Sequence, residues 1–197
     1  MHNLAVRMAS VFVLYGESAE EDIDIYAYAC EAVLALLVNI LVCLVIAFLF
    51  GRVMEGLVFI SGFALLRRYT GGYHAKSHFA CIMIFSIVVV CAMLLLNVVD
   101  RLQMVGIVMM VIATVSLVGI LLIGTIQDVN KPSGYEFDKL LKRKSRLVAF
   151  TLWGLCGIGY YLLDTQVGLM LSLAMMAVFY SMGWVVMSCK INFFRGV

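Results

Sequence analysis

Long apolar stretches separated by short polar segments run through almost the whole chain. Six of them predict membrane-spanning helices, at about 28–50, 53–68, 79–99, 103–126, 147–163 and 167–189. A helix needs about 20 mostly apolar residues to cross the hydrocarbon layer. The second stretch is the weakest, because it is short and Glu55, Gly56 and Gly62 interrupt it, so a re-entrant segment is the alternative there. The pattern predicts an all-α, polytopic transmembrane helix bundle.

The composition indicates that lipid is the main solvent of this chain. Of the 197 residues, 64% are hydrophobic and 13% charged, with a mean hydropathy of +1.08, whereas soluble domains are about half apolar and a quarter charged. Residues 26–190 are therefore expected to form one transmembrane domain. Residues 1–25 carry an acidic cluster after a short apolar run. They predict an interfacial N-terminal segment, with a disordered leader as the alternative.

The distribution of basic residues predicts the orientation of the bundle. With six spans, both termini and the loops at 69–78 and 127–146 share one side, which then holds 12 of the 14 Lys and Arg residues. Only Arg52 and Arg101 remain for the other side. Short cytoplasmic loops carry an excess of basic residues, so both termini and both loops are predicted to be cytoplasmic.

A basic run follows the chain's single proline, Pro132, within the longer predicted loop. Its positive residues are Lys139, Lys142, Arg143, Lys144 and Arg146. Such a run can anchor the chain to anionic headgroups, at about 1 kcal/mol per basic residue. It can also form a docking patch for an acidic peptide. The sequence leaves both interpretations open.

The densest group of chemically active side chains lies between residues 67 and 81, and it includes His74 and Cys81. Cysteine reacts as a thiolate, which a neighbouring base favours. On one straight helix a seven-residue offset separates the two residues by about 10.5 Å, whereas proton transfer needs about 3 Å. The pair Gly71-Gly72 predicts a break in the helix that lets His74 fold back.

We expect the third span to start at His78, after Ser77 as N-cap. Cys81 then lies in the first helical turn, where the helix dipole favours an anion. The spacing of His74 and His78 also fits a zinc site, but the position after His74, which is Glu in zinc proteases, holds Ala75. The group could instead be a structural interface anchor, and the chain an assembly factor or a small transporter. A transporter would need polar residues near the membrane centre, and the third, fourth and sixth spans have almost none.

The stretch from Leu65 to Cys81 contains Arg-Arg, Gly-Gly-Tyr-His and a cysteine seven residues after the histidine. It closely resembles the signature of the AgrB (accessory gene regulator protein B) family. The segments 25–31 and 130–133, the latter followed by the basic run, are also similar to the family. The resemblance touches most of the chain between about residues 20 and 190.

The resemblance implies a multi-pass plasma-membrane cysteine endopeptidase of Gram-positive quorum sensing, acting as a homodimer. Its substrate would be a short AgrD-like precursor peptide, whose C-terminal part is removed before cyclisation, typically to a thiolactone autoinducer. The resemblance assigns catalysis to His74 and Cys81. It assigns supporting roles to Arg67 or Arg68 and to Gly71 or Gly72.

The residues themselves extend this prediction. Arg67, Arg68 or backbone N–H groups at the start of the third span are options for an oxyanion hole. Glu31 and Asn39, both in the first span, are polar residues that could orient His74, although Glu31 could instead pair with an arginine. We expect no cofactor, metal or nucleic acid.

Overall fold

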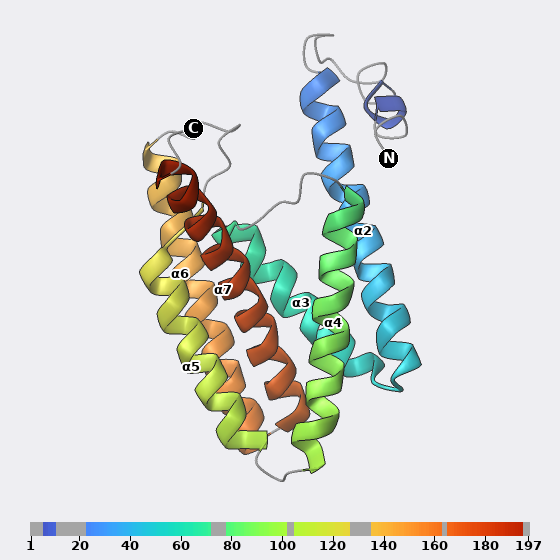
Figure 1. Cartoon of the computed structure of the whole chain (residues 1–197), viewed down its shortest axis with the longest axis vertical. Coiled ribbons are helices and arrows are strands. Elements are labelled where there is room, and N and C mark those ends of the chain that lie inside the picture. The colour runs from blue at the N-terminus through green and yellow to red at the C-terminus, as the bar shows by residue number, and fades with distance from the viewer. Residues whose placement is uncertain are drawn as a thin grey trace.

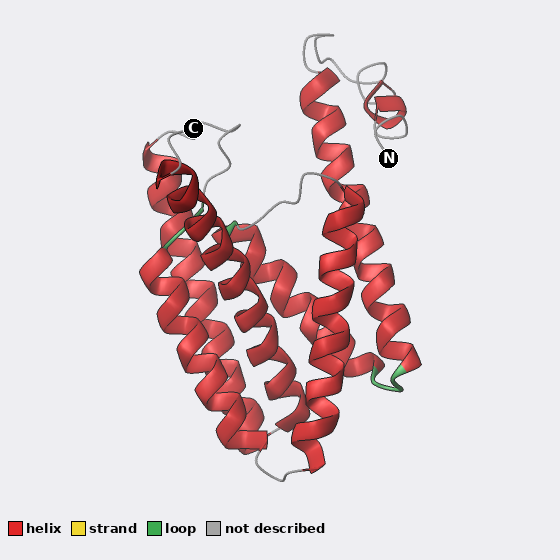
Figure 2. Cartoon of the chain, in the orientation of Figure 1, coloured by secondary structure: helices red, strands yellow, loops and turns green. Residues whose placement is uncertain are grey.

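The structure is a computed structural model that describes residues 6–10, 23–71, 78–101, 105–126, 135–162 and 165–194. Within these ranges all regular structure is helical (Figure 2). The long helices are α2 (Ile23–Leu49), α3 (Val53–Thr70), α4 (His78–Arg101), α5 (Val105–Ile123), α6 (Tyr135–Leu162) and α7 (Thr165–Phe194). The prediction of an all-α bundle is confirmed.

Four of these helices are long and apolar enough to cross a membrane, namely α2, α4, α5 and α7. Much of their surface is apolar and uncovered by protein, as at Phe48, which is 74% exposed, and Leu122, which is 81% exposed. A large apolar surface of this kind, on helices long enough to cross the hydrocarbon layer, indicates contact with lipid. The protein is therefore a membrane protein, while the number of spans and the cytoplasmic side remain predictions.

Helix α7 is the centre of the bundle, because it packs against α3, α4, α5 and α6. Two clusters of buried side chains meet along it. One joins α7 to α2, α3 and α4 and includes Phe59, Phe85 and Met93. The other joins α7 to α5, α6 and the end of α3 and includes Leu66 and Met182. Accordingly, α3 and α7 lie between the α2–α4 pair and the α5–α6 pair (Figure 1).

The residues that interrupt the second predicted span have packing roles in α3. A Cβ at Gly56 would lie 2.4 Å from the Ala47 Cβ, so the glycine permits close contact with α2. The Glu55 carboxylate accepts a hydrogen bond of 3.1 Å from Arg52, whose guanidinium also binds Gln166 at the start of α7. These contacts tie the turn between α2 and α3 to the rest of the bundle.

Part of the predicted loop at 127–146 is helical, because α6 begins at Tyr135. The basic run is helical, and its five Lys and Arg side chains are exposed while Ser145 is buried. Ser145 starts a stripe that continues through Ala149, Leu152 and Cys156. The spacing of these buried residues is that of one helix face, so packing against the bundle extends the helix into the polar segment.

Candidate functional site

Cys81 lies in the first turn of α4, which begins at His78 as the sequence predicts. Its side chain is half-buried and not in a disulfide. The first turn of a helix offers unpaired backbone N–H groups and the positive end of the dipole. The expected N-cap Ser77 lies outside the described residues. The end of the bundle that holds Cys81 is also the end at which α2 begins and α7 ends (Figure 1).

A small cavity of about 100 Å³ brings Cys81 together with two of the predicted supporting residues, Arg67 of α3 and Asn39 of α2. Its remaining walls are almost entirely apolar: Phe63, Ile84, Phe85, Val88, Ala177 and Ser181. Residues from four helices thus surround the cysteine. Electrostatic interactions inside such an apolar enclosure are stronger than in water.

Arg67 is the arginine of the Arg-Arg pair that faces this cavity. Its guanidinium donates a 3.3 Å hydrogen bond to Ser181 Oγ on α7 and lies over the Phe63 ring, 5.5 Å from its centroid. It is also within electrostatic range of the Cys81 sulfur. Arg68 is exposed instead and lies over the Tyr69 ring. One positive charge is therefore held near the cysteine.

Asn39 contributes an amide to the same cavity. Its Oδ1 atom is buried and has no hydrogen-bond partner among the described residues. A buried polar atom without a partner costs about 1–3 kcal/mol, and such atoms are rare enough to need an explanation. Glu31 lies on α2 eight residues before Asn39, about 12 Å along the axis. It is not among the residues that line the cavity.

Gly71 ends α3 in a conformation that side chains rarely adopt, with φ 72° and ψ −152°. Its N–H donates to Arg67 O at 3.0 Å, and Ile126 N donates to Thr70 O at 2.9 Å. A Cβ on Gly71 would lie 2.2 Å from Ile126 O. The predicted break at this glycine is confirmed, and it fixes the end of α3 against the segment after α5. Gly72 lies outside the described residues.

Replacing Gly71 by Ala should destabilise the protein, because the side chain is strained at this φ and collides with the Ile126 carbonyl. Strain of this kind costs about 1–3 kcal/mol. Gly124→Ala is the matched control, since Gly124 also has a positive φ of 81° but open space where a Cβ would lie. Thermal unfolding in detergent micelles should show a lower midpoint for Gly71→Ala than for Gly124→Ala. Equal midpoints would contradict this role for the Ile126 contact.

Several predicted site residues are not placed at the cavity. His74 lies outside the described residues, as does the side chain of His78, so the zinc alternative rests on groups that the structure does not describe. The basic side chains Lys139, Lys142, Arg143, Lys144 and Arg146 are exposed on the first turns of α6. This part of α6 lies at the same end of the bundle as the start of α4 (Figure 1).

Sequence reasoning missed Ser181, which holds the Arg67 guanidinium from 114 positions away in the chain. A signal was present, because Ser181, like Ser172, is a polar residue in the apolar middle of α7. Polar residues inside membrane helices tend to face the bundle interior. No comparable sequence signal marks Phe63 and Phe85, which form the apolar side of the cavity. Lipid-facing and core positions of this chain are both apolar, so the sequence does not distinguish them.

These features define a helical membrane protein with a cysteine, an arginine and an asparagine gathered at one end of the bundle. The family model for accessory gene regulator B matches residues 5–189. The chain therefore belongs to the accessory gene regulator B family.

Two relatives from Clostridium perfringens are similar over a shorter region. One, from strain SM101 / Type A, is named "Putative AgrB-like protein" and is 31% identical over 68 residues, or 34% of this chain and 32% of the relative. The other, "Putative AgrB-like protein 2" from strain 13 / Type A, is 29% identical over 68 residues, with the same shares. The chain thus matches about a third of the length of these curated relatives. No solved structure matches it.

Proposed function

We propose that this protein is a membrane-embedded cysteine endopeptidase that removes the C-terminal part of a short precursor peptide and promotes cyclisation of the remainder. The observation that carries the proposal is the cavity in which Cys81 meets Arg67 and Asn39. Family membership supports the same conclusion. The precursor would be AgrD-like and the product a cyclic (thio)lactone autoinducer.

The reaction would proceed through a thioester on Cys81. His74, assigned by the family resemblance, takes the thiol proton, and the sulfur attacks the scissile carbonyl. Collapse of the tetrahedral intermediate breaks the C–N bond, and the leaving amine takes the proton from His74. A thiol within the bound peptide then attacks the thioester, which closes the ring and releases the Cys81 thiol. The thioester keeps enough free energy for this step, so no ATP is required.

The surroundings of Cys81 suit this chemistry. Negative charge develops on the carbonyl oxygen in both steps, and the Arg67 guanidinium and the Asn39 amide are donors that could stabilise it. Water must be excluded until the ring has closed, because it would hydrolyse the thioester. The phenylalanine rings and aliphatic side chains of the cavity wall would limit that access.

The chain would lie in the plasma membrane of a Gram-positive bacterium as a multi-pass protein, with the Cys81 end on the cytoplasmic side. It would act as a homodimer without a cofactor.

Trapping the acyl-enzyme tests the mechanism. The purified full chain is mixed with the synthetic precursor peptide and quenched in acid at short times. Mass spectrometry should show an adduct on Cys81 equal in mass to the N-terminal part of the peptide minus water. Neutral hydroxylamine should remove it, because it cleaves thioesters. Cleavage without an adduct at any time point, or an adduct that resists hydroxylamine, would contradict the thioester mechanism.

The basic face of α6 is proposed to capture acidic residues of the precursor. Replacing Lys139, Lys142, Arg143, Lys144 and Arg146 by Glu should raise KM about tenfold or more through lost electrostatic attraction. A precursor with its acidic residues changed to Lys should restore processing by this variant. Impermeant maleimide labelling of single-cysteine reporters checks that orientation is unchanged. Normal KM with normal orientation would contradict docking.

A further inference from the structure

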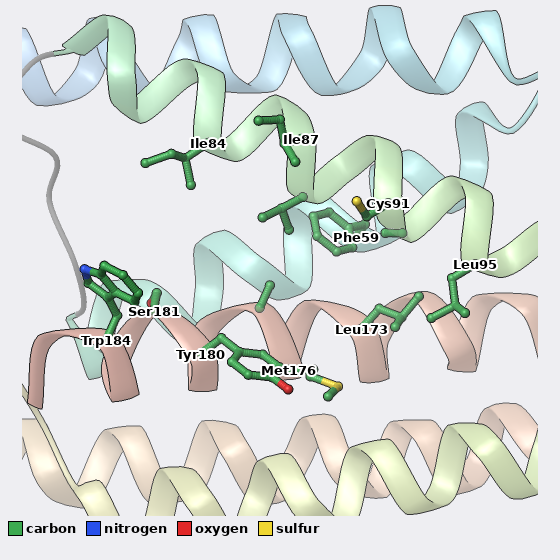
Figure 3. Close-up of a pocket in the computed structure, with 13 residues that line it drawn as sticks. Phe59, Ile84, Ile87, Cys91, Leu95, Leu173, Met176, Tyr180, Ser181 and Trp184 are labelled. Atoms are coloured by element: carbon green, nitrogen blue, oxygen red, sulfur yellow. The ribbon is translucent and has the colours of Figure 1, made fainter. Parts of the chain in front are cut away.

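A second and larger cavity, about 560 Å³ in volume, lies between α4 and α7. Side chains of both helices border it, with Phe59 of α3 between them (Figure 3). Its walls are hydrophobic apart from the polar atoms of a few side chains such as Ser181. Ile87 and Trp184 are both 57% exposed, so the cavity is a groove open on the lipid-facing side. We call it the α4–α7 groove.

The α4–α7 groove is continuous with the Cys81 cavity. Ile84, Val88, Ala177 and Ser181 line both of them. From Cys81 the groove follows α4 past Cys91, ten residues further on, which corresponds to about 15 Å along the helix axis. The Cys81 cavity, where Arg67 is hydrogen-bonded to Ser181, is therefore the polar end of a continuous space, and the α4–α7 groove is its apolar part. This arrangement suits a ligand with a reacting polar group at one end and apolar side chains beyond it.

We propose that the α4–α7 groove binds the apolar side chains of the substrate on the amino side of the scissile bond. This inference rests on the proposed peptidase function. The amino-side part stays bonded to Cys81 as a thioester, whereas the carboxyl-side part must leave as the free amine. Only the former needs an anchoring site that persists between the two steps. Filling the groove with apolar side chains also keeps water from the thioester.

The openness of the groove toward lipid supports a membrane-associated peptide as its occupant. An apolar peptide segment that lies at the membrane interface can enter sideways between α4 and α7 without first crossing water. The volume of about 560 Å³ falls within the usual range of about 300–1,000 Å³ for ligand pockets. The continuity with the nucleophile distinguishes this groove from the other apolar faces of the bundle.

Peptidyl chloromethyl ketones provide a direct test. The Cys81 sulfur displaces chloride from such a reagent and forms a thioether, so the modification rate reports binding next to the nucleophile. Two short reagents are compared that differ only in the residue before the reactive carbon, Leu or Asp. The full chain in lipid nanodiscs is used, and modification of Cys81 is followed by peptide mapping. Iodoacetamide, which has no side chain to bind, measures the intrinsic reactivity of Cys81.

Three variants separate the groove from the nucleophile. Cys91→Trp fills the groove, Cys91→Ala leaves it open, and Leu94→Trp adds the same bulk to a side chain that is 51% exposed and borders neither cavity. We expect the Leu reagent to modify wild-type Cys81 at least about 10-fold faster than the Asp reagent does. Cys91→Trp should abolish this preference. Cys91→Ala and Leu94→Trp should retain it, and the iodoacetamide rate should be the same in all four proteins.

Different results would overturn the inference. Equal rates for the Leu and Asp reagents, or an unchanged preference in Cys91→Trp, would show that the groove does not bind the substrate. A phospholipid that native mass spectrometry finds in wild type and not in Cys91→Trp, together with equal rates, would assign the groove to lipid. Loss of dimers in Cys91→Trp with equal rates would assign it to a second copy. Failure of the peptidase proposal looks different, because Cys81→Ala would then still process the precursor peptide.

Discussion

Replacing Cys81 by Ala should abolish processing of the precursor peptide. The substitution removes the only sulfur that shares a described cavity with Arg67 and Asn39, and no acyl-enzyme can form without it. Loss of the nucleophile in other covalent proteases lowers kcat by a factor of about 10⁴ or more. Cys81→Ser should also be inactive, since a serine hydroxyl is a much weaker nucleophile without a stronger base. His74→Ala should fail at the same step.

Co-expression with the precursor peptide, followed by mass spectrometry of the products, measures this effect. Cys156→Ala is the matched control, because Cys156 is also a free cysteine but lies on α6 and lines neither the Cys81 cavity nor the α4–α7 groove. It should process the peptide at a rate close to that of wild type. Unchanged processing by Cys81→Ala would rule out the cysteine mechanism, and loss in Cys156→Ala would indicate that the bundle does not tolerate replacement of a cysteine.

The sequence predicts the helices well where a single physical rule decides. Long apolar stretches place α2, α4, α5 and α7 because only helices satisfy the backbone inside lipid. The start of α4 at His78 agrees with the prediction made from the glycine pair and the expected N-cap. The start of α6 could not be read in this way, since the basic run between residues 139 and 146 looks like a polar loop. Its helical state depends on the buried stripe that begins at Ser145.

The arrangement around Cys81 was only partly predictable. The motif places Arg67, Arg68 and Gly71 close to the cysteine in the chain, but which arginine faces inward depends on how α3 packs against α7. The contact with Ser181 decides it. Gly71 shows the reverse case, because the helix break was predicted while the neighbour that requires a glycine, Ile126, was not. Contacts between segments that are far apart in the sequence form only in the assembled bundle, so local sequence patterns do not predict them.

Asn39 is where the structure adds most to the sequence, and replacing it by Leu should separate catalysis from stability. If the amide stabilises the oxyanion, kcat should fall about 10²- to 10³-fold, with little change in KM. Its buried Oδ1 has no partner among the described residues, so the apolar side chain should relieve a cost of about 1–3 kcal/mol. A less active but more thermostable protein is therefore expected.

Asn97→Leu provides the control for this prediction. Asn97 is a half-buried asparagine near the other end of α4, sixteen residues from Cys81 and about 24 Å away along the axis. Its replacement should leave kcat unchanged. Kinetics of precursor cleavage and thermal unfolding midpoints in the same detergent measure both properties. If Asn39→Leu instead lowers the unfolding midpoint together with kcat, Asn39 has a packing role. Removal of a side chain that holds the bundle together lowers the stability of the protein.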